Sequence, residues 1–184
     1  MEEQDVSYGV KFINPKLIID SLEIGDGMVV GDFGCGTGYF TFPLAQKVGQ
    51  TGLVYALDIL KDKLETIESE AKILGLSNIL AKRVNLEKIG GSKIEDENLD
   101  WVFLINMLFQ NKDREIIIQE AKRVLKTGGK VLVIEWNKEN ASFGLADNLR
   151  VSQMEISDLA QKNGFAITKE IKVSDFHFGI ILEK

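Results

Sequence analysis

The sequence is poor in the residues that build disulfides and most metal sites. Its 184 residues include one cysteine, Cys35, and one histidine, His177. A single cysteine excludes an internal disulfide. One cysteine and one histidine are also too few for a metal site of the usual cysteine–histidine kind. These counts do not exclude a metal site built from oxygen ligands.

Long apolar runs and an excess of positive charge are missing too. The longest apolar stretch, near residues 101–109, is interrupted by Asn106, and it falls short of the roughly 18 residues that a membrane span needs. The N-terminus is acidic where a targeting peptide would be basic, so we expect a cytoplasmic protein. The net charge of −6 disfavours nucleic acid as the default partner, because proteins that bind a phosphate backbone usually carry a basic stripe.

What the sequence does contain is an ordinary globular composition, with 45% hydrophobic and 27% charged residues. It has no repeats and no low-complexity linker, so we expect one domain over residues 1–184. Residues 1–24 are expected to form a loose segment or lid followed by a helix. That helix begins at Asn14-Pro15, a good cap followed by a good first residue, and ends at residues 25–27.

Apolar segments alternate with amphipathic ones along most of the chain. Apolar residues spaced three or four apart predict helices over residues 39–48, 61–74 and 113–125, the last closed by Gly128-Gly129. Short apolar segments between them predict strands over residues 28–32, 52–58, 79–84, 100–105 and 130–135. Strands separated by helices pair in parallel through right-handed crossovers. The pattern therefore predicts a layered α/β sheet.

The C-terminal part breaks this alternation. Ser152 and Glu155 have the spacing of a capping box, which predicts a further helix. Two apolar segments, 165–173 and 176–182, follow with only Ser174-Asp175 between them. Strands joined this tightly form an antiparallel hairpin.

A glycine-rich turn lies between the first strand and the next helix. Gly34, Gly36 and Gly38 have the spacing G-x-G-x-G; glycine permits positive φ and lets a ligand approach the backbone. A tight connection without a ligand needs fewer glycines than this. Tyr39 stands where the dinucleotide fingerprint G-x-G-x-x-G has its third glycine, and no G-K-[ST] follows, which excludes a P-loop.

Two aspartates accompany the turn. Asp32 precedes it, where a carboxylate would repel a pyrophosphate but suits a cationic amino or sulfonium group. Asp58 ends the second strand, where it can accept hydrogen bonds from both hydroxyls of a ribose. Dinucleotide sites also have an acid there, so Asp58 indicates an adenosine ligand without identifying it. A surface aspartate that merely ends a strand is the alternative.

Four segments resemble the successive motifs of class I S-adenosylmethionine-dependent methyltransferases. They are VVGDFGCGTGYFT, YALDI, LDWVFLINML and RVLKTGGKVLVIEW. The C-terminal segment is similar to the branch that includes ubiquinone and menaquinone biosynthesis methyltransferases. The resemblance implies a Rossmann-like three-layer sandwich whose seven-stranded, mostly parallel sheet has an antiparallel last strand. Gly31 departs from the family, which usually has a larger residue there.

The resemblance implies S-adenosylmethionine as cofactor, S-adenosylhomocysteine as its product, and a set of cofactor residues that follow the first four strands. These are Asp32, Gly34, Cys35, Gly36, Gly38, Asp58, Ile59, Asn85, Leu86 and Asn106. Asp58 would hold the ribose, Ile59 would pack on the adenine, and Asn85 replaces the acid that the family often places near the adenine amino group. Cys35 is expected to be a small filler of the turn rather than a nucleophile.

The implied function is methyl transfer to a small-molecule acceptor, on family analogy and because little is inserted between the strands. We assign no catalytic residue: His177 alternates with apolar residues, which favours a structural or solvent-facing role over a general base. Glu135 and Trp136 are expected to shape an acceptor pocket, and Tyr8 and Phe12 to close over it or pack.

Two other function classes stay open. One is a methyltransferase fold that binds the cofactor without chemistry of its own or works with a partner. The other is a nicotinamide-dependent oxidoreductase, which Tyr39 disfavours. A homodimer is an option for the assembly.

Overall fold

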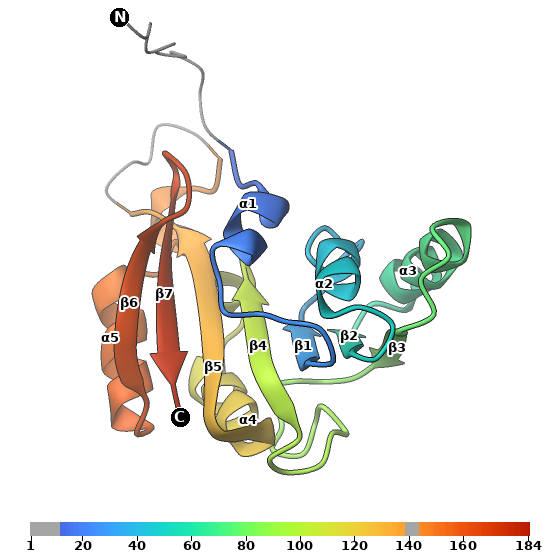
Figure 1. Cartoon of the computed structure of the whole chain (residues 1–184). Coiled ribbons are helices and arrows are strands. Elements are labelled where there is room, and N and C mark those ends of the chain that lie inside the picture. Colours follow the sequence, from blue (N-terminus) through green and yellow to red (C-terminus); the bar gives the residue numbers. More distant parts are fainter. Residues whose placement is uncertain (1–11, 139–143) are drawn as a thin grey trace, which may run out of the picture.

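Seven strands form one sheet in the part of the chain that the computed structural model describes, residues 12–138 and 144–184 (Figure 1). The strands are β1 (Val29–Phe33), β2 (Leu53–Asp58), β3 (Ile79–Arg83), β4 (Leu99–Ile105), β5 (Leu125–Trp136), β6 (Ala166–Lys172) and β7 (His177–Glu183). Their order across the sheet is β3-β2-β1-β4-β5-β7-β6.

The first five strands run parallel to one another, and β7 lies between β5 and β6, antiparallel to both. β6 and β7 are the predicted hairpin. The expected fold class, a mostly parallel seven-stranded sheet with an antiparallel C-terminal hairpin, is confirmed. The carboxyl ends of β1, β2, β3 and β4 meet at one edge, which is where such sheets bind ligands.

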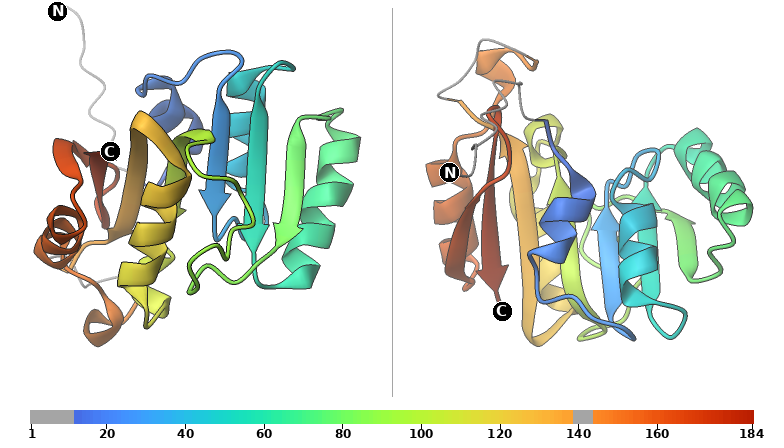
Figure 2. Two further views of the ribbon diagram at one scale, coloured as in Figure 1. Left: turned by 90° about the horizontal axis from the view of Figure 1, so that it is seen from below. Right: turned by 45° about the horizontal axis from the view of Figure 1, so that its top comes forward.

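Helices cover both faces of the sheet (Figure 2). They are α1 (Pro15–Asp20), α2 (Thr41–Val48), α3 (Lys61–Ile73), α4 (Arg114–Val124) and α5 (Gln153–Lys162), with short 3-10 turns η1 (Leu108–Gln110) and η2 (Asp147–Leu149). Buried residues of α1 and α2 pack against Val30 and Phe103 on one face, and those of α4 and α5 pack against Val102 and Val133 on the other. The predicted three-layer arrangement follows from this alternation of side chains along each strand.

Two helix starts were predicted from their capping residues, and both are confirmed. The side chain of Asn14 accepts a hydrogen bond from the backbone N–H of Leu17, and Ser152 accepts one from Glu155. The carboxylate of Glu155 binds Arg114, so it ties α5 to α4.

Two predicted boundaries are wrong. α1 ends at Asp20 instead of residues 25–27. α4 ends at Val124, and Gly128 and Gly129 lie inside β5 instead of closing the helix. The cause is pairing at both edges of this stretch: Leu125 pairs with Leu99 of β4, and the backbone of Gly128 and Gly129 exchanges hydrogen bonds with Lys184.

The expected lid falls largely on residues 1–11, Tyr8 included, which lie outside the described residues. Phe12 is described, and its ring lies 6.2 Å from that of Phe176. Among the described helices, none is both long and apolar enough to cross a membrane.

Candidate functional site

The glycine turn leaves space at one of its three glycines. All three have positive φ: +75° at Gly34, +53° at Gly36 and +92° at Gly38. A Cβ atom on Gly38 would lie 2.5 Å from the ring of Phe42, and one on Gly34 would lie 3.2 Å from Cβ of Met107. A Cβ on Gly36 would have no neighbour within 4 Å. Gly36 is therefore the position where the absent side chain opens room for a ligand.

Asp58 faces the same space and is held in place from two sides. Its Oδ2 accepts a hydrogen bond from the N–H of Gly36 at 3.0 Å, and its Oδ1 accepts one from Leu60 at 2.9 Å. A carboxylate has about four acceptor sites, so each oxygen keeps capacity for a ligand hydroxyl. Asp58 thus has a fixed orientation and free acceptor sites.

These residues line a cleft of about 330 Å³ at the carboxyl ends of β1 to β4. Its lining residues are Gly34, Gly36, Asp58, Ile59, Leu60, Lys63, Val84, Asn85, Leu86, Glu87, Met107, Gln110 and Asn111. The volume lies within the roughly 300–1,000 Å³ of small-molecule sites. Six of the ten predicted cofactor residues meet in it.

Sequence reasoning missed seven lining residues. Leu60, Val84, Glu87 and Met107 lie within two residues of positions it did name. The signal for these was proximity to a strand end. Lys63 reaches the cleft from α3, and Gln110 and Asn111 reach it from the turn after β4. Their positions depend on how the chain folds back over the sheet, which the local sequence does not show.

Four predicted residues do not line the cleft. Asp32 is buried, with Oδ2 accepting from the hydroxyl of Thr41 at 2.6 Å; burial raises the pKa of its carboxyl to about 6, with Thr41 opposing and the charge of Asp58 adding to the rise. Cys35 is buried, and burial raises the pKa of its thiol far above the usual range, which fits a filler and not a nucleophile. Gly38 packs on Phe42, and Asn106 contacts His177.

His177 is a buried, hydrogen-bonded residue. Its ring lies 4.1 Å from that of Trp136, Nδ1 is 2.9 Å from the hydroxyl of Ser174, and Nε2 is 3.3 Å from Nδ2 of Asn106. Burial, together with the charge of Arg150, lowers its pKa to about 4. The ring is therefore neutral near pH 7, and both of its nitrogens have hydrogen-bond partners. These contacts favour a structural role for His177.

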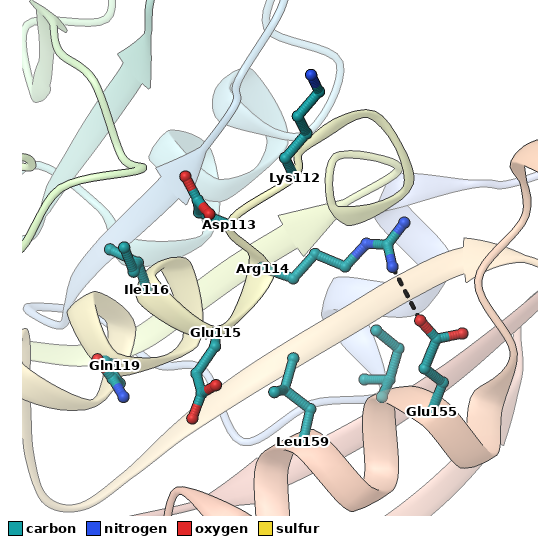
Figure 3. A pocket seen from close by; sticks show the side chains of 9 residues that line it. Lys112, Asp113, Arg114, Glu115, Ile116, Gln119, Glu155 and Leu159 are labelled. Carbon is teal, nitrogen blue, oxygen red and sulfur yellow. Dashed lines mark hydrogen bonds and ion pairs between the residues drawn. The ribbon is translucent and has the colours of Figure 1, made fainter.

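A larger hollow lies elsewhere. A groove of about 630 Å³ runs between α4 and α5 and is lined by polar residues of both helices and by Ile116, Ile156 and Leu159. Figure 3 shows Arg114 and Glu155 pointing toward each other across it. The groove contains none of the glycine turn, so the smaller cleft is the candidate site.

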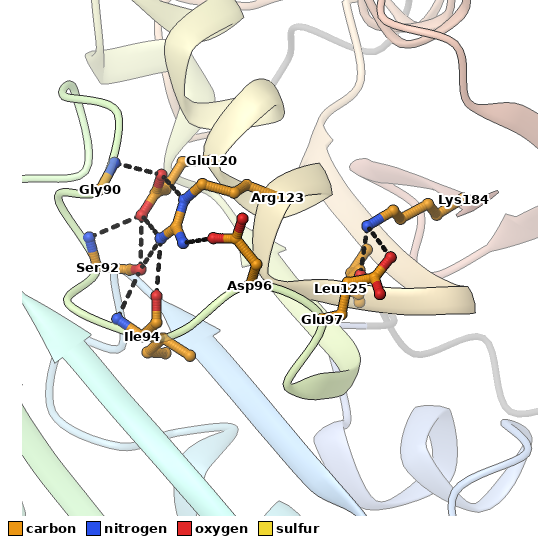
Figure 4. Close-up of polar contacts among 9 residues, drawn as sticks. All are labelled: Gly90, Ser92, Ile94, Asp96, Glu97, Glu120, Arg123, Leu125 and Lys184. Carbon is orange, nitrogen blue, oxygen red and sulfur yellow. Dashed lines mark hydrogen bonds and ion pairs between the residues drawn. The ribbon is translucent and has the colours of Figure 1, made fainter.

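The wall of the cleft after β3 is anchored by an ion pair whose acid is fully buried. Glu120 of α4 accepts hydrogen bonds from the N–H groups of Gly90 and Ser92 and from the guanidinium of Arg123, which also binds Asp96 (Figure 4). This network fixes the long connection between β3 and β4. Asn85 and Leu86 lie at the start of that connection.

The chain matches a family model described as "Methyltransferase domain" over residues 24–171. It is 31% identical over 134 residues to the ubiquinone/menaquinone biosynthesis C-methyltransferase UbiE of Haemophilus ducreyi, covering 72% of this chain and 51% of that protein. It is 26% identical over 151 residues to an arsenite methyltransferase of Aquipseudomonas alcaligenes, covering 80% and 41%. The chain thus spans about half the length of these relatives.

The fold agrees with a solved structure, the SAM-dependent methyltransferase from Aquifex aeolicus. The TM-score is 0.85 at 24% identity, over 93% of this chain and 89% of the other. At 24% sequence identity, the structural similarity shows the fold alone. With the family match over most of its length, the glycine turn and the sheet order, the chain belongs to the class I S-adenosylmethionine-dependent methyltransferase family.

Proposed function

We propose that this protein transfers a methyl group from S-adenosylmethionine to a small-molecule acceptor. The observation that carries the proposal is the cleft beside Gly36, where a missing side chain and the oriented carboxylate of Asp58 face the same space. Relatives named for quinone biosynthesis and for arsenite support a small acceptor.

The residues of the cleft fit the cofactor of the family. Asp58 has free acceptor sites for two ribose hydroxyls. Ile59 is 54% exposed although it is apolar, and Leu86 also lines the cleft. Both offer apolar surface to an adenine ring. The oxygen of Asn85 accepts from the N–H of Glu87 and keeps one lone pair for a donor. Asp32, Cys35, Gly38 and Asn106 do not line the cleft, so we assign them no direct contact with the cofactor.

The main task of the protein in this reaction is to orient the cofactor and the acceptor. The bound cofactor supplies a methyl group on a good leaving group, and holding two reactants in line is worth effective molarities of about 10⁵–10⁸ M. Neutral His177, with both nitrogens engaged, holds Asn106 and Trp136 at the ends of β4 and β5. It is not poised to take a proton, so we expect an acceptor that is already nucleophilic at neutral pH.

We propose that residues 1–184 form one domain. The single sheet and the family match over residues 24–171 support it. A chain with one cysteine suits a reducing compartment, so we place the activity in the cytoplasm. Light scattering on the purified protein distinguishes a monomer from a homodimer.

Calorimetry with S-adenosylmethionine, S-adenosylhomocysteine and NAD tests the cofactor. We expect both adenosyl compounds to bind and NAD to give no response, because the turn lacks the third glycine of a dinucleotide site. Tight binding of NAD without a response to the adenosyl compounds would refute the proposal.

The runner-up function is a cofactor-binding protein without turnover, and the engaged state of His177 favours it. Transfer of a labelled methyl group into a metabolite extract separates the two. A labelled product supports the enzyme and identifies the acceptor. Cofactor binding with no product in any extract supports the runner-up.

Replacing Gly36 by alanine tests the opening in the turn. We expect a loss of about 1 kcal/mol of unfolding free energy from the positive φ, and at least a tenfold loss of S-adenosylhomocysteine affinity because the new methyl group enters the cleft. Gly75→Ala is the matched control, since Gly75 has φ +67° and no neighbour within 4 Å but lies at the end of α3, away from the cleft. Equal affinity losses in both variants would contradict the assignment.

A further inference from the structure

Glu135, the last residue but one of β5, is a fully buried acid to which the proposed function gives no role. Its Oε1 accepts a hydrogen bond from the backbone N–H of Leu108 at 2.6 Å, and the N–H groups of Met107 and Phe109 also face the carboxyl group. Oε2 has no hydrogen-bond partner among the described residues. Glu135 thus provides an acceptor at the start of η1. The first N–H groups of a helical turn have no partner within the turn.

The turn that Glu135 holds is also a wall of the cleft. Asn106 adopts φ +51° and donates its N–H to Ile134 of β5; such a conformation persists in a non-glycine residue only where its surroundings enforce it. The chain then returns over Glu135 and presents Met107, Gln110 and Asn111 to the cleft.

The carbonyl side of the turn has its own partners. Arg114 donates from Nε to the carbonyl of Leu108 at 2.8 Å, and Asn111 donates from Nδ2 to that of Met107 at 2.6 Å. Glu135 is the side chain that engages the N–H side. Removing Oε1 would leave the buried N–H of Leu108 without its acceptor, which favours an open turn.

We infer that Glu135 is a positioning residue for the cofactor cleft, and that its protonated form holds the wall of Met107, Gln110 and Asn111 closed. This inference rests on the proposed function, because the ligand of the cleft is taken to be the cofactor. A protonated carboxyl keeps a carbonyl oxygen for the N–H groups without placing an unpaired charge in the core.

The titration of Glu135 falls in an accessible range. Burial raises the pKa of its carboxyl to about 7, against the N–H groups of residues 107–109 and the positive charge of Arg114 on α4. Arg114 is itself paired with Glu155 of α5, and the residue opposite Glu135 on β7 is the uncharged Phe178. Opening the turn would hydrate the acid and lower its pKa, so deprotonation favours the open turn.

Cofactor affinity should therefore fall as the pH rises through 7. A ligand that contacts the closed wall selects the protonated form, so its binding takes up a proton. The apparent affinity of the wild type is expected to be up to about tenfold weaker at pH 8 than at pH 6, since about nine in ten molecules are then deprotonated.

The test is titration calorimetry of S-adenosylhomocysteine at pH 6, 7 and 8 with the wild type, Glu135→Gln and Glu135→Ala. Glutamine mimics the protonated acid, and we expect it to keep the pH 6 affinity of the wild type at all three values. Alanine should bind weakly throughout. Glu115→Gln is the matched control: it alters an acid of α4 that binds Lys162 and lies outside the cleft lining, and it should retain the pH response of the wild type.

Each remaining outcome has one meaning. A pH response that is equal in the wild type and in Glu135→Gln overturns the inference and directs attention to Asp32, the other raised acid near the cleft. If the variants do not fold, the wild type alone decides: binding heats at pH 7 must vary with the ionisation enthalpy of the buffer by an amount that shows proton uptake, and their constancy overturns the inference. No binding by the wild type at any pH refutes the proposed function instead.

Discussion

Glu120→Ala is expected to lower the free energy of unfolding by about 2–4 kcal/mol, because N–H groups left without an acceptor in the interior cost about 1–3 kcal/mol each. Glu120 is fully buried, and its carboxylate binds Arg123, the N–H groups of Gly90 and Ser92, and the hydroxyl of Ser92. The variant leaves the N–H groups of Gly90 and Ser92 and the Nε–H of Arg123 without an acceptor, while the other guanidinium nitrogens keep Asp96 and the carbonyl of Ile94. Urea unfolding followed by circular dichroism measures the loss.

Glu115→Ala is the matched control on the same helix. Glu115 binds Lys162 on the surface, and exposed pairs of this kind contribute about 0–1 kcal/mol. Similar losses in the two variants would show that the network of Glu120 contributes no more than a surface pair.

The Glu120 network also predicts a response to acid. Burial alone would raise the pKa of Glu120, but hydrogen bonds from Arg123, Ser92 and Gly90 outweigh it and lower the pKa to about 2. A lowered pKa contributes stability above the unfolded value, near pH 4–5, and that stability is lost as the pH falls toward 2. In Glu120→Gln this part of the acid transition should be absent.

Asp58→Ala is expected to weaken S-adenosylhomocysteine binding by at least tenfold and by up to about a hundredfold. Hydrogen bonds to a charged group contribute roughly 1.5–3 kcal/mol each, and every 1.4 kcal/mol is a factor of ten. The variant also frees the N–H groups of Gly36 and Leu60, so unfolding must be measured beside calorimetry.

Asp62→Ala is the control for Asp58, because Asp62 lies in the first turn of α3 and outside the cleft lining. Its affinity should match the wild type. An affinity in Asp58→Ala that also matches the wild type would remove Asp58 from the site, whatever its effect on folding.

Local pattern was sufficient for most of the fold, and the exceptions share a cause. β1 to β4 and the hairpin follow from runs of apolar residues and their turns. The start of β5 does not, because residues 125–129 are partly polar and contain Gly128-Gly129, which is typical of a helix end. Their state is decided by Leu99 and Lys184, which are distant in sequence.

The candidate site divides in the same way. Gly36, Asp58 and Asn85 directly follow or end strands, so parallel pairing alone brings them together. Asp32 also lies at a strand end, but its side chain turns to Thr41 in α2, an orientation that depends on how that helix packs. Gln110 and Asn111 depend on the turn held by Glu135, 24 or more residues further along the chain.

The place of β7 between β5 and β6 has a consequence for synthesis on the ribosome. β6 leaves the exit tunnel before β7, yet it pairs with the sheet only through β7. Until β7 emerges, β6 has no edge to join, and the edge of β5 stays exposed. Vectorial folding can complete the five parallel strands and the candidate cleft early, and it must delay β6 and β7. A nascent chain stalled inside β7 should therefore have a formed cleft and an unprotected sheet edge, which is where aggregation begins.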